Sequence, residues 1–431
     1  MTDPDAPEPD EEAGASDADD RPAALLGDAD GPADETDGGS WWARPRARLL
    51  VGAGLVAALL AVIVVAVLRS GGDVTTLDQA GAEDHELVAT DDTDPPGTAA
   101  PEPPATEAAA PDTIGTTTTT RKPRRPGTGP PGPLTNQAVD YPGYERRGAL
   151  VVKIDNLDPD ARPQAGITLA DVVFEERVEG NITRFAAVFH GSDSEEIGPV
   201  RSGRSTDLGI VGQLNRPLYA FSGANGAFLD LLRAGPLVDI GADARPGAYY
   251  RTGGRVIPHN LFTSTGSLYR QAGALPPYPL WPFRPAGTVP AGARPVVGAA
   301  LQFGGGFTRV VYRWDPVEGG GAFVREQNGS VHYDTDNWPV APQNVVIQFV
   351  DYVDSGVPDG SGHPIPEARM IGRGNGWLLT GGAALPITWE RDSLESATRF
   401  LGPDGSVVPF AAGKTWVELV PTWAGATIEW R

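Results

Sequence analysis

The chain has 431 residues, a formal net charge of −22 at pH 7 and no cysteine. The missing thiols exclude disulfides, thiolate metal sites and a cysteine nucleophile. Residues 1–40 hold fourteen acidic residues and one arginine, whereas residues 148–431 hold 29 acidic and 23 basic residues. An acidic segment with almost no aromatic residues buries too little apolar surface to fold, so we predict a disordered tail over residues 1–40.

Residues 49–68 form an apolar run, LLVGAGLVAALLAVIVVAVL, that carries no charge. A helix of this length rises about 30 Å, the thickness of the hydrocarbon layer of a membrane. Arg44, Arg46 and Arg48 precede the run and only Arg69 follows it closely, which places the N-terminus in the cytoplasm. We therefore predict a single-pass signal anchor in the cell membrane, in contact with lipid through residues 49–68, and extracytoplasmic domains after it.

Residues 70–147 consist mainly of Pro, Thr, Ala, Asp and Gly and have no periodic apolar pattern. This composition is typical of a flexible or polyproline-like spacer, so we predict a disordered linker that holds the following domains away from the bilayer. A basic cluster in the linker is interpreted either as a contact for anionic wall polymer or lipid, or as a solvated part of the spacer. It comprises Arg121, Lys122, Arg124 and Arg125.

Strand and helix patterns alternate over residues 148–290, which predicts an α+β or α/β domain. A hairpin turn is expected at Gly180 and Asn181. The expected strands are 149–156, 171–179, 183–189 and 217–224, and the expected helices are 204–214, 227–233 and 264–272. After an irregular proline-rich stretch at residues 276–283, short apolar strands and glycine-rich turns predict a mostly β domain over residues 294–431.

Several long motifs in residues 148–431 are similar to those of one bacterial family. They are RPQAGITLADVVFEERVEGNITRF, IGPVRSGR, SGAN and PHNLF, followed by GNGWLLTGGAALPITWERDS and GPDGSVVPFAAGKTWVELVP. In these motifs the chain resembles the YerB-like envelope proteins, whose N- and C-terminal domains form a domain of unknown function (3048). The resemblance implies a location outside the cytoplasm, because such domains often occur on lipoproteins. The chain departs from that pattern in its anchor, with an apolar helix in place of a lipidated cysteine.

Charged residues gather around the expected hairpin. In an extended strand Glu175 and Glu179 share one face, about 13 Å apart at Cα, and Glu176 points to the other. The first two are candidates for an acid and a base in glycoside hydrolysis, although that chemistry needs carboxyl groups about 5–9.5 Å apart. The alternative is structural, with Glu179 paired to Arg184 across the hairpin and fixing its register.

Residues 198–209, GPVRSGRSTDLG, place two arginines shortly before an expected helix. The guanidinium groups of Arg201 and Arg204, with the N–H groups of the helix start, would form a site for phosphate, carboxylate or a wall polymer. The alternative is that Ser202 or Ser205 caps the helix. In that interpretation Arg201 pairs with Glu175 or Glu179 in a structural network.

His259 lies in the sequence Pro258-His259-Asn260 and is a candidate general base, or part of a ligand pocket with Asp155 and Asn156. None of the five histidines has the spacing of a metal site, so we expect no metal and no cofactor. Serine-hydrolase signatures are missing, and the net acidic charge argues against a nucleic-acid partner.

Five tryptophans recur at expected strand positions of the second domain, where they serve either core packing or a sugar-binding face. They are Trp377, Trp389, Trp416, Trp423 and Trp430.

Three functions remain open. The first is a non-enzymatic module that binds an anionic or glycan ligand of the cell envelope. The second is a hydrolase or transferase acting on cell-wall material through Glu175 or Glu179 with His259. The third is a scaffold whose outer domains and cytoplasmic tail recruit different partners, among them envelope proteins. The expected ligand-binding residues are Asp155, Asn156, Glu179, Arg184, Arg201, Ser202, Arg204, His259 and Asn260.

Overall fold

The computed structural model describes residues 127–139, 143–270, 273–305, 308–358 and 362–431. The expected acidic tail, the apolar run at residues 49–68 and most of the expected linker lie outside these ranges. No helix within the described ranges is long and apolar enough to cross a membrane.

Strands and short helices alternate in the first half of the described chain. The strands are β1 (Leu150–Asp155), β2 (Val172–Arg177), β3 (Thr183–Phe189), β4 (Leu218–Ala220), β5 (Val238–Asp239), β6 (Tyr250–Arg251) and β7 (Leu261–Phe262). The α-helices are α2 (Thr206–Val211), α3 (Gly226–Ala234) and α4 (Thr265–Leu268). Short 3-10 turns are η1 (Tyr144–Arg146), η2 (Ile167–Leu169), η3 (Glu179–Asn181), η4 (Gly212–Leu214) and η5 (Pro246–Ala248).

The second half is built almost entirely of strands. They are β8 (Arg294–Gln302), β9 (Arg309–Asp315), β10 (Ala322–Gln327), β11 (Ser330–Val331), β12 (Asn344–Val350), β13 (Tyr352–Pro358), β14 (Pro364–Ala368), β15 (Gly372–Thr380), β16 (Ala383–Arg391), β17 (Arg399–Leu401), β18 (Thr415–Pro421) and β19 (Ala426–Trp430). One 3-10 turn, η6 (Glu318–Gly320), precedes β10.

Most of these elements agree with the sequence. The strands expected over residues 149–156, 171–179 and 183–189 are β1, β2 and β3, and the expected helices are α2, α3 and α4. Gly180 (φ 71°) and Asn181 (φ 57°) both adopt the left-handed conformation that a tight hairpin turn requires. The described chain is therefore mostly β, with its α-helices confined to the first half.

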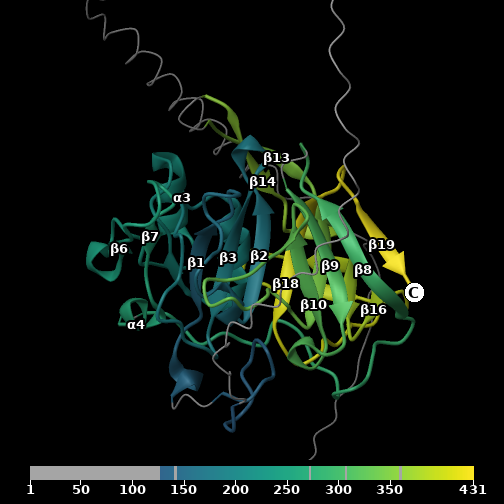
Figure 1. The fold of residues 1–431 in the computed structure, drawn as a ribbon. Coiled ribbons are helices and arrows are strands. Elements are labelled where there is room, and N and C mark those ends of the chain that lie inside the picture. The colour runs from purple at the N-terminus through teal and green to yellow at the C-terminus, as the bar shows by residue number, and fades with distance from the viewer. Residues whose placement is uncertain (1–126, 140–142, 271–272, 306–307, 359–361) are drawn as a thin grey trace, which may run out of the picture. The chain divides into compact units, whose positions relative to one another are not determined.

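The two halves share one sheet. Its path runs β11-β10-β9-β8-β16-β15-β12-β18-β2-β3-β1-β4-β5, and β17 and β19 pair at its side. The halves meet where β18 pairs in parallel with β2, and β12 pairs in parallel with β18 (Figure 1). A sequence with two expected domains thus folds around a continuous set of backbone hydrogen bonds.

Each face of the central strands carries its own core. Val152, Ile154 and Phe185 pack with residues of β8, β9 and β10, and we call this side the β10 face. Val151 and Phe174 pack with α2 on the other side, the α2 face. Successive side chains of a strand alternate between the faces, so the neighbours Glu175 and Glu176 belong to different environments.

A buried ionic network on the β10 face joins the two halves. Arg325 of β10 has no exposed surface and donates to Glu175 of β2 at 2.6 Å. Glu418 of β18 lies beside Glu175 in the paired register and accepts a hydrogen bond from Tyr312. Burial and the charge of Glu175 raise the pKa of Glu418 well above its usual range. A protonated Glu418 removes one of two adjacent negative charges, and Arg325 neutralises the other.

Hydrogen bonds through His332 also connect Arg325 to Gln164 in the first half of the chain. Its Nη1 donates to Nδ1 of His332 at 2.8 Å, and Nε2 of that ring donates to Gln164 at 2.7 Å. Burial and the charge of Arg325 lower the pKa of His332 well below its usual range, so the ring stays neutral. A neutral ring can accept from arginine with one nitrogen and donate with the other, which this chain of contacts requires.

Replacing Arg325 by methionine is expected to destabilise the fold by about 3–5 kcal/mol, because Glu175 would remain buried without its partner. Urea unfolding of a fragment spanning residues 127–431 measures this loss. Arg373→Met, on an exposed side chain of β15, serves as the control and should change stability by less than about 0.5 kcal/mol. Equal stability of Arg325→Met and the wild type would show that the network does not join the halves.

His190 gives the fold a defined acid sensitivity. Burial and the neighbouring charge of Arg147 lower its pKa to about 4. The unfolded chain therefore binds more protons than the folded chain between about pH 6.5 and 4, and stability falls as the pH decreases through that window. We expect His190→Gln to lose less stability than the wild type between these pH values, by at most about 3 kcal/mol. Parallel pH profiles for the two proteins would contradict this assignment.

Candidate functional site

The candidate site lies at one edge of the sheet, where several strands end together. β4 runs parallel to β1, and β2 has the same direction because β3 pairs antiparallel with both β1 and β2. The carboxyl ends of these strands therefore face the same edge, which is where open α/β sheets hold their ligands. Asp155 closes β1 there, and Glu179 follows β2 in η3.

Asp155 organises two side chains at this edge. One carboxylate oxygen accepts from Nε of Arg201 at 2.9 Å and from Nδ1 of His259 at 2.7 Å. The other accepts from the backbone N–H of Leu157 at 3.2 Å. We call Asp155, Arg201 and His259 the Asp155 cluster. Asp155 is buried, but 23% of the Arg201 side chain remains exposed.

The Asp155 cluster leaves defined groups for a ligand. Nη1 and Nη2 of Arg201 and Nε2 of His259 have no hydrogen-bond partner among the described residues. A neutral imidazole that donates from Nδ1 to Asp155 presents Nε2 as an acceptor, and a protonated one presents a second donor. The two arginine N–H groups form a fork that matches carboxylate and phosphate oxygens.

Backbone hydrogen bonds hold the loop that carries Arg201 between two strand ends. Its N–H donates to the carbonyl of Lys153 in β1 at 2.9 Å, and its carbonyl accepts from Ser222, after β4, at 3.0 Å. The N–H of Asp155 donates to Pro199 at 2.9 Å. The loop is thus extended along the sheet edge, and Arg201 has little backbone freedom to lose on binding.

One carboxylate, that of Glu179, pairs with two arginines, Arg184 and Arg204, beside the Asp155 cluster. Arg204 binds both oxygens of Glu179, with Nε at 2.8 Å from Oε2, and Arg184 lies 3.4 Å from the same carboxylate. Burial alone would raise the pKa of Glu179, but the hydrogen bond from Arg204 and the charge of Arg184 outweigh it and lower the pKa to about 2. Glu179 is therefore an ionised structural partner and cannot act as a proton donor near neutral pH.

A buried network on the α2 face supports this arrangement. Lys153 of β1 binds Glu176 and lies 2.7 Å from Asp207 of α2. Asp207 also accepts from the hydroxyl of Tyr219 at 2.5 Å and from the backbone N–H of Arg204 at 2.6 Å. Burial and the charge of Asp207 raise the pKa of Glu176 to about 7. This network fixes the start of α2, and with it the position of Arg204.

The structure separates residues that the sequence grouped together. Glu175 and Asn156 belong to the β10 face, where the Asn156 amide donates to Glu175 and Gln327. Asn260 binds Arg251 and the carbonyl of Thr252 instead of the Asp155 cluster. Of the pocket expected around His259, only the contact with Asp155 is present.

Three structural expectations are wrong. β2 ends at Arg177, so Glu179 leaves the strand, and the register partner of Arg184 is Glu176 rather than Glu179. Arg201 pairs with Asp155 rather than with Glu175 or Glu179.

Neither Ser202 nor Ser205 caps α2 with its side chain. The N–H groups of Asp207 and Leu208 donate instead to the backbone carbonyls of Arg204 and Ser205, at 3.0 and 3.1 Å. The pairing of Glu179 with Arg184, which was one alternative, is confirmed.

The five tryptophans of the second half have different environments. Trp389 and Trp416 are buried in the core, as the packing interpretation predicts. Trp377 packs edge to face against Trp430, with ring centroids 5.8 Å apart. Trp423 is 62% exposed. They do not line one common surface, so a shared sugar-binding face on these strands is not formed.

No group of three or more His, Asp or Glu side chains could hold a metal ion within the part of the chain that the structure describes.

Comparison with known proteins supports the resemblance in the motifs. The N-terminal domain of a protein of unknown function, DUF3048, matches residues 134–276, and the C-terminal domain of DUF3048 matches residues 300–417. The chain belongs to the DUF3048 family. It is 27% identical over 303 residues to a Bacillus subtilis (strain 168) protein named "Putative lipoprotein YerB", which covers 69% of this chain and 88% of that protein.

A crystal structure of YerB from Bacillus subtilis has the same fold. It matches with a TM-score of 0.59 and 24% identity, covering 69% of this chain and 99% of the YerB chain.

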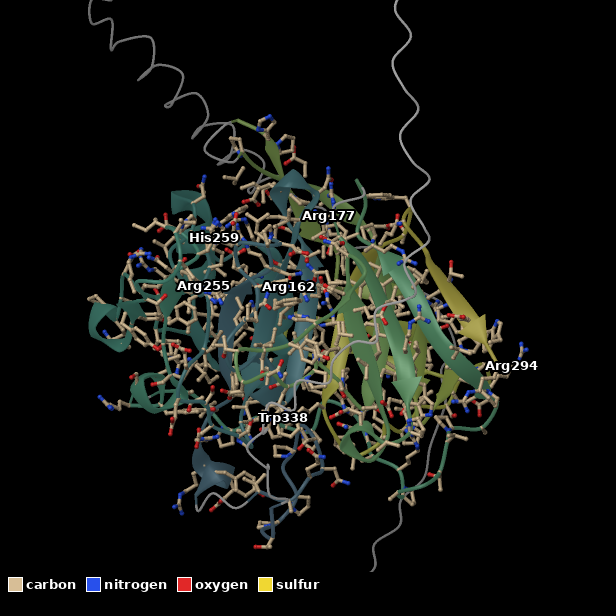
Figure 2. The ribbon with its side chains drawn as sticks, in the orientation of Figure 1. Arg162, Arg177, Arg255, His259, Arg294 and Trp338 are labelled. Atoms are coloured by element: carbon tan, nitrogen blue, oxygen red, sulfur yellow. The ribbon has the colours of Figure 1, made fainter. Side chains whose placement is uncertain are left out.

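The motifs that connect the chain with the DUF3048 family meet at the candidate site. IGPVRSGR supplies Arg201 and Arg204, PHNLF supplies His259, and the SGAN motif supplies the Ser222 N–H that holds the arginine loop. Figure 2 shows His259 near one end of the central strands. Segments distant in the sequence thus converge on one edge of the DUF3048 fold.

The two arginines are expected to differ in their effect on stability. Arg204→Ala should lower the free energy of unfolding by about 2–3 kcal/mol, because Glu179 loses its two-oxygen partner in a half-buried position. Arg201→Ala should lower it by about 1 kcal/mol, since His259 and Leu157 still bind Asp155. Urea unfolding measures both, and a larger loss in Arg201→Ala would show that Arg201 is the structural residue.

Proposed function

We propose that the described domain is a non-enzymatic binding module of the bacterial envelope that captures an anionic group, phosphate or carboxylate, on an envelope polymer. The observation that carries this proposal is the shared use of Asp155 by Arg201 and His259. Asp155 orients both side chains and leaves their outer nitrogens for a ligand. The donors of Arg184 and Arg204 are directed to Glu179 and to the backbone carbonyls of Ser202 and Gly203. The anion contact therefore rests on Arg201 with His259.

A location outside the cytoplasm fits this proposal. The apolar run at residues 49–68 would anchor the chain, and the residues after it would act as a spacer. The name of the relative YerB describes a lipoprotein, which is a membrane-anchored class of protein. Both observations support an extracytoplasmic domain that reaches a wall polymer from the membrane.

A cell-wall hydrolase or transferase is the second candidate, and the Asp155–His259 pair favours it. A histidine oriented by a carboxylate is a recurring form of general base. The carboxylates first considered for this role are not suited to it, because Glu175 is bound to Arg325 on the β10 face and Glu179 is held ionised by Arg204. Any catalysis would therefore depend on His259.

Arg201→Ala is expected to weaken binding of purified anionic wall polymer about 10- to 100-fold, the range for losing a charge-assisted hydrogen bond. Co-sedimentation of the full chain with the polymer, with release of soluble products followed in parallel, measures binding and turnover together. Arg373→Ala, whose side chain is 77% exposed on β15, is the matched control and should bind as the wild type does.

Retention without product release, lost in Arg201→Ala, is the result that supports a binding module. Product release that His259→Gln abolishes would establish the enzyme instead. Unchanged binding in Arg201→Ala would exclude the proposed anion contact.

A further inference from the structure

Two adjacent aliphatic side chains are held in solvent beside the anion contact. Val256 is 65% exposed and Ile257 is 71% exposed. They belong to residues 252–258, which we call the Val256 loop and which lie between β6 and β7, outside β1 (Figure 1). Among the described residues, no other two consecutive large apolar side chains are both exposed. Single exposed apolar residues are common on protein surfaces, whereas contiguous ones mark contact sites.

The path of the backbone brings this pair to the Asp155 cluster. Backbone hydrogen bonds between residues 197–200 and 261–263 hold these two segments antiparallel. Arg201 and His259 lie at the end of that pairing, where both bind the carboxylate of the cluster. The N–H of His259 donates to the carbonyl of Val256 at 2.8 Å, so a single turn separates the apolar pair from the imidazole ring.

Arg255 holds the Val256 loop in this position. Its guanidinium group donates to the carbonyl of Pro163, in the loop after β1, and its Cζ lies 5.6 Å from the ring centroid of Phe262. At the base of the loop the N–H of Thr252 donates to the carbonyl of Asn260 at 2.9 Å. Figure 2 shows Arg255 on the side of the central strands where the Asp155 cluster lies. These contacts fix the backbone around the apolar pair, so the loop has little freedom to lose when a ligand binds.

The charge on the Val256 loop and its flanks is positive. Residues 244–262 contain three arginines and no acidic residue. Two of them, Arg251 and Arg255, donate to neutral acceptors, a side-chain amide oxygen and a backbone carbonyl, so their charges are not neutralised by these contacts. The neighbouring loop after β1 carries Asp158 and Asp160, and the first of these pairs with an arginine of the same loop at 3.4 Å. Arginines on the same segment as the apolar pair favour an anionic head group beside it.

We propose that the ligand of this site is an amphiphile, a phosphate group joined to a hydrocarbon chain. The phosphate binds Arg201 and His259, and the chain lies along Val256 and Ile257. This inference rests on the proposed anion contact and narrows its ligand from any anionic envelope polymer to one whose phosphate is attached to a lipid chain. Such a chain removes both aliphatic side chains from water, which a purely polar polymer does not do.

Alkyl phosphates of increasing chain length test this with the full chain in detergent. Methyl, butyl and hexyl phosphate are titrated by calorimetry, with inorganic phosphate as the reference. Each methylene group that becomes half-buried strengthens binding about twofold, so hexyl phosphate should bind at least about tenfold tighter than methyl phosphate. In the double variant Val256→Ser/Ile257→Ser the alkyl phosphates should bind within about twofold of one another.

Val317→Ser is the matched control, because Val317 is 83% exposed in the second half of the chain. It should keep the chain-length dependence of the wild type. Partition of the probes into micelles is the same for all variants and cancels in this comparison. Arg201→Ala should weaken the binding of every probe about 10- to 100-fold, since all of them share the phosphate.

The outcomes separate the amphiphile from the anion contact beneath it. Equal binding of methyl and hexyl phosphate by the wild type, or an undiminished chain-length gain in the double variant, would overturn the amphiphile and leave the anion contact intact. Absence of binding of every probe, or unchanged binding in Arg201→Ala, would overturn both.

Discussion

The rest of the structure depends on the parallel pairing of β18 with β2. Arg325 makes this pairing possible because it binds one of the two carboxylates that the pairing buries. Parallel register brings Glu175 and Glu418 side by side in a core where two carboxylates could not both remain charged. Arg325 arrives from β10 and binds Glu175, while burial keeps a proton on Glu418. A buried network of this kind adds little stability over an apolar core, but loss of one partner is costly. It therefore ties the two halves to a single register.

This register determines which charged side chains are bound to the protein itself at the edge where β1, β2 and β4 end. With β2 fixed, Glu176 faces Lys153 on the α2 face, and Lys153 in turn holds Asp207 at the start of α2. Asp207 binds the backbone of Arg204, which places that side chain on Glu179. Two of the three arginines at this edge, Arg184 and Arg204, are therefore bound to Glu179. Arg201 lies beside His259 on Asp155, and the outer nitrogens of both side chains are the groups that we propose bind the ligand.

Local elements could be predicted from the sequence because their signals are local. The hairpin at Gly180 and Asn181, and strands such as β1, follow from turn chemistry and apolar runs. The contact of His259 with Asp155 was also anticipated. The sequence suggested Glu175 or Glu179 as the partner of Arg201, and the partner is Asp155. This pairing could not be predicted, because it depends on where β2 ends and on the path of the loop after Pro199. The pairing of Glu175 with Arg325 joins residues 150 positions apart, and only the closed sheet brings them together. Lys153 lies inside the apolar run ALVVKIDN, and a lysine in a buried strand indicates a buried acidic partner, here Glu176 and Asp207.

The central claim is that the fold leaves Arg201 and His259, and not Arg184 or Arg204, to a ligand. Side-chain ¹⁵N NMR of the arginines and histidines, recorded while phosphate is titrated into the protein, tests it most directly. The account predicts saturable shifts for the Arg201 guanidinium and the His259 ring, with the signals of Arg184 and Arg204 unchanged. Equal shifts of all three arginines, or movement of Arg204 without Arg201, would contradict it.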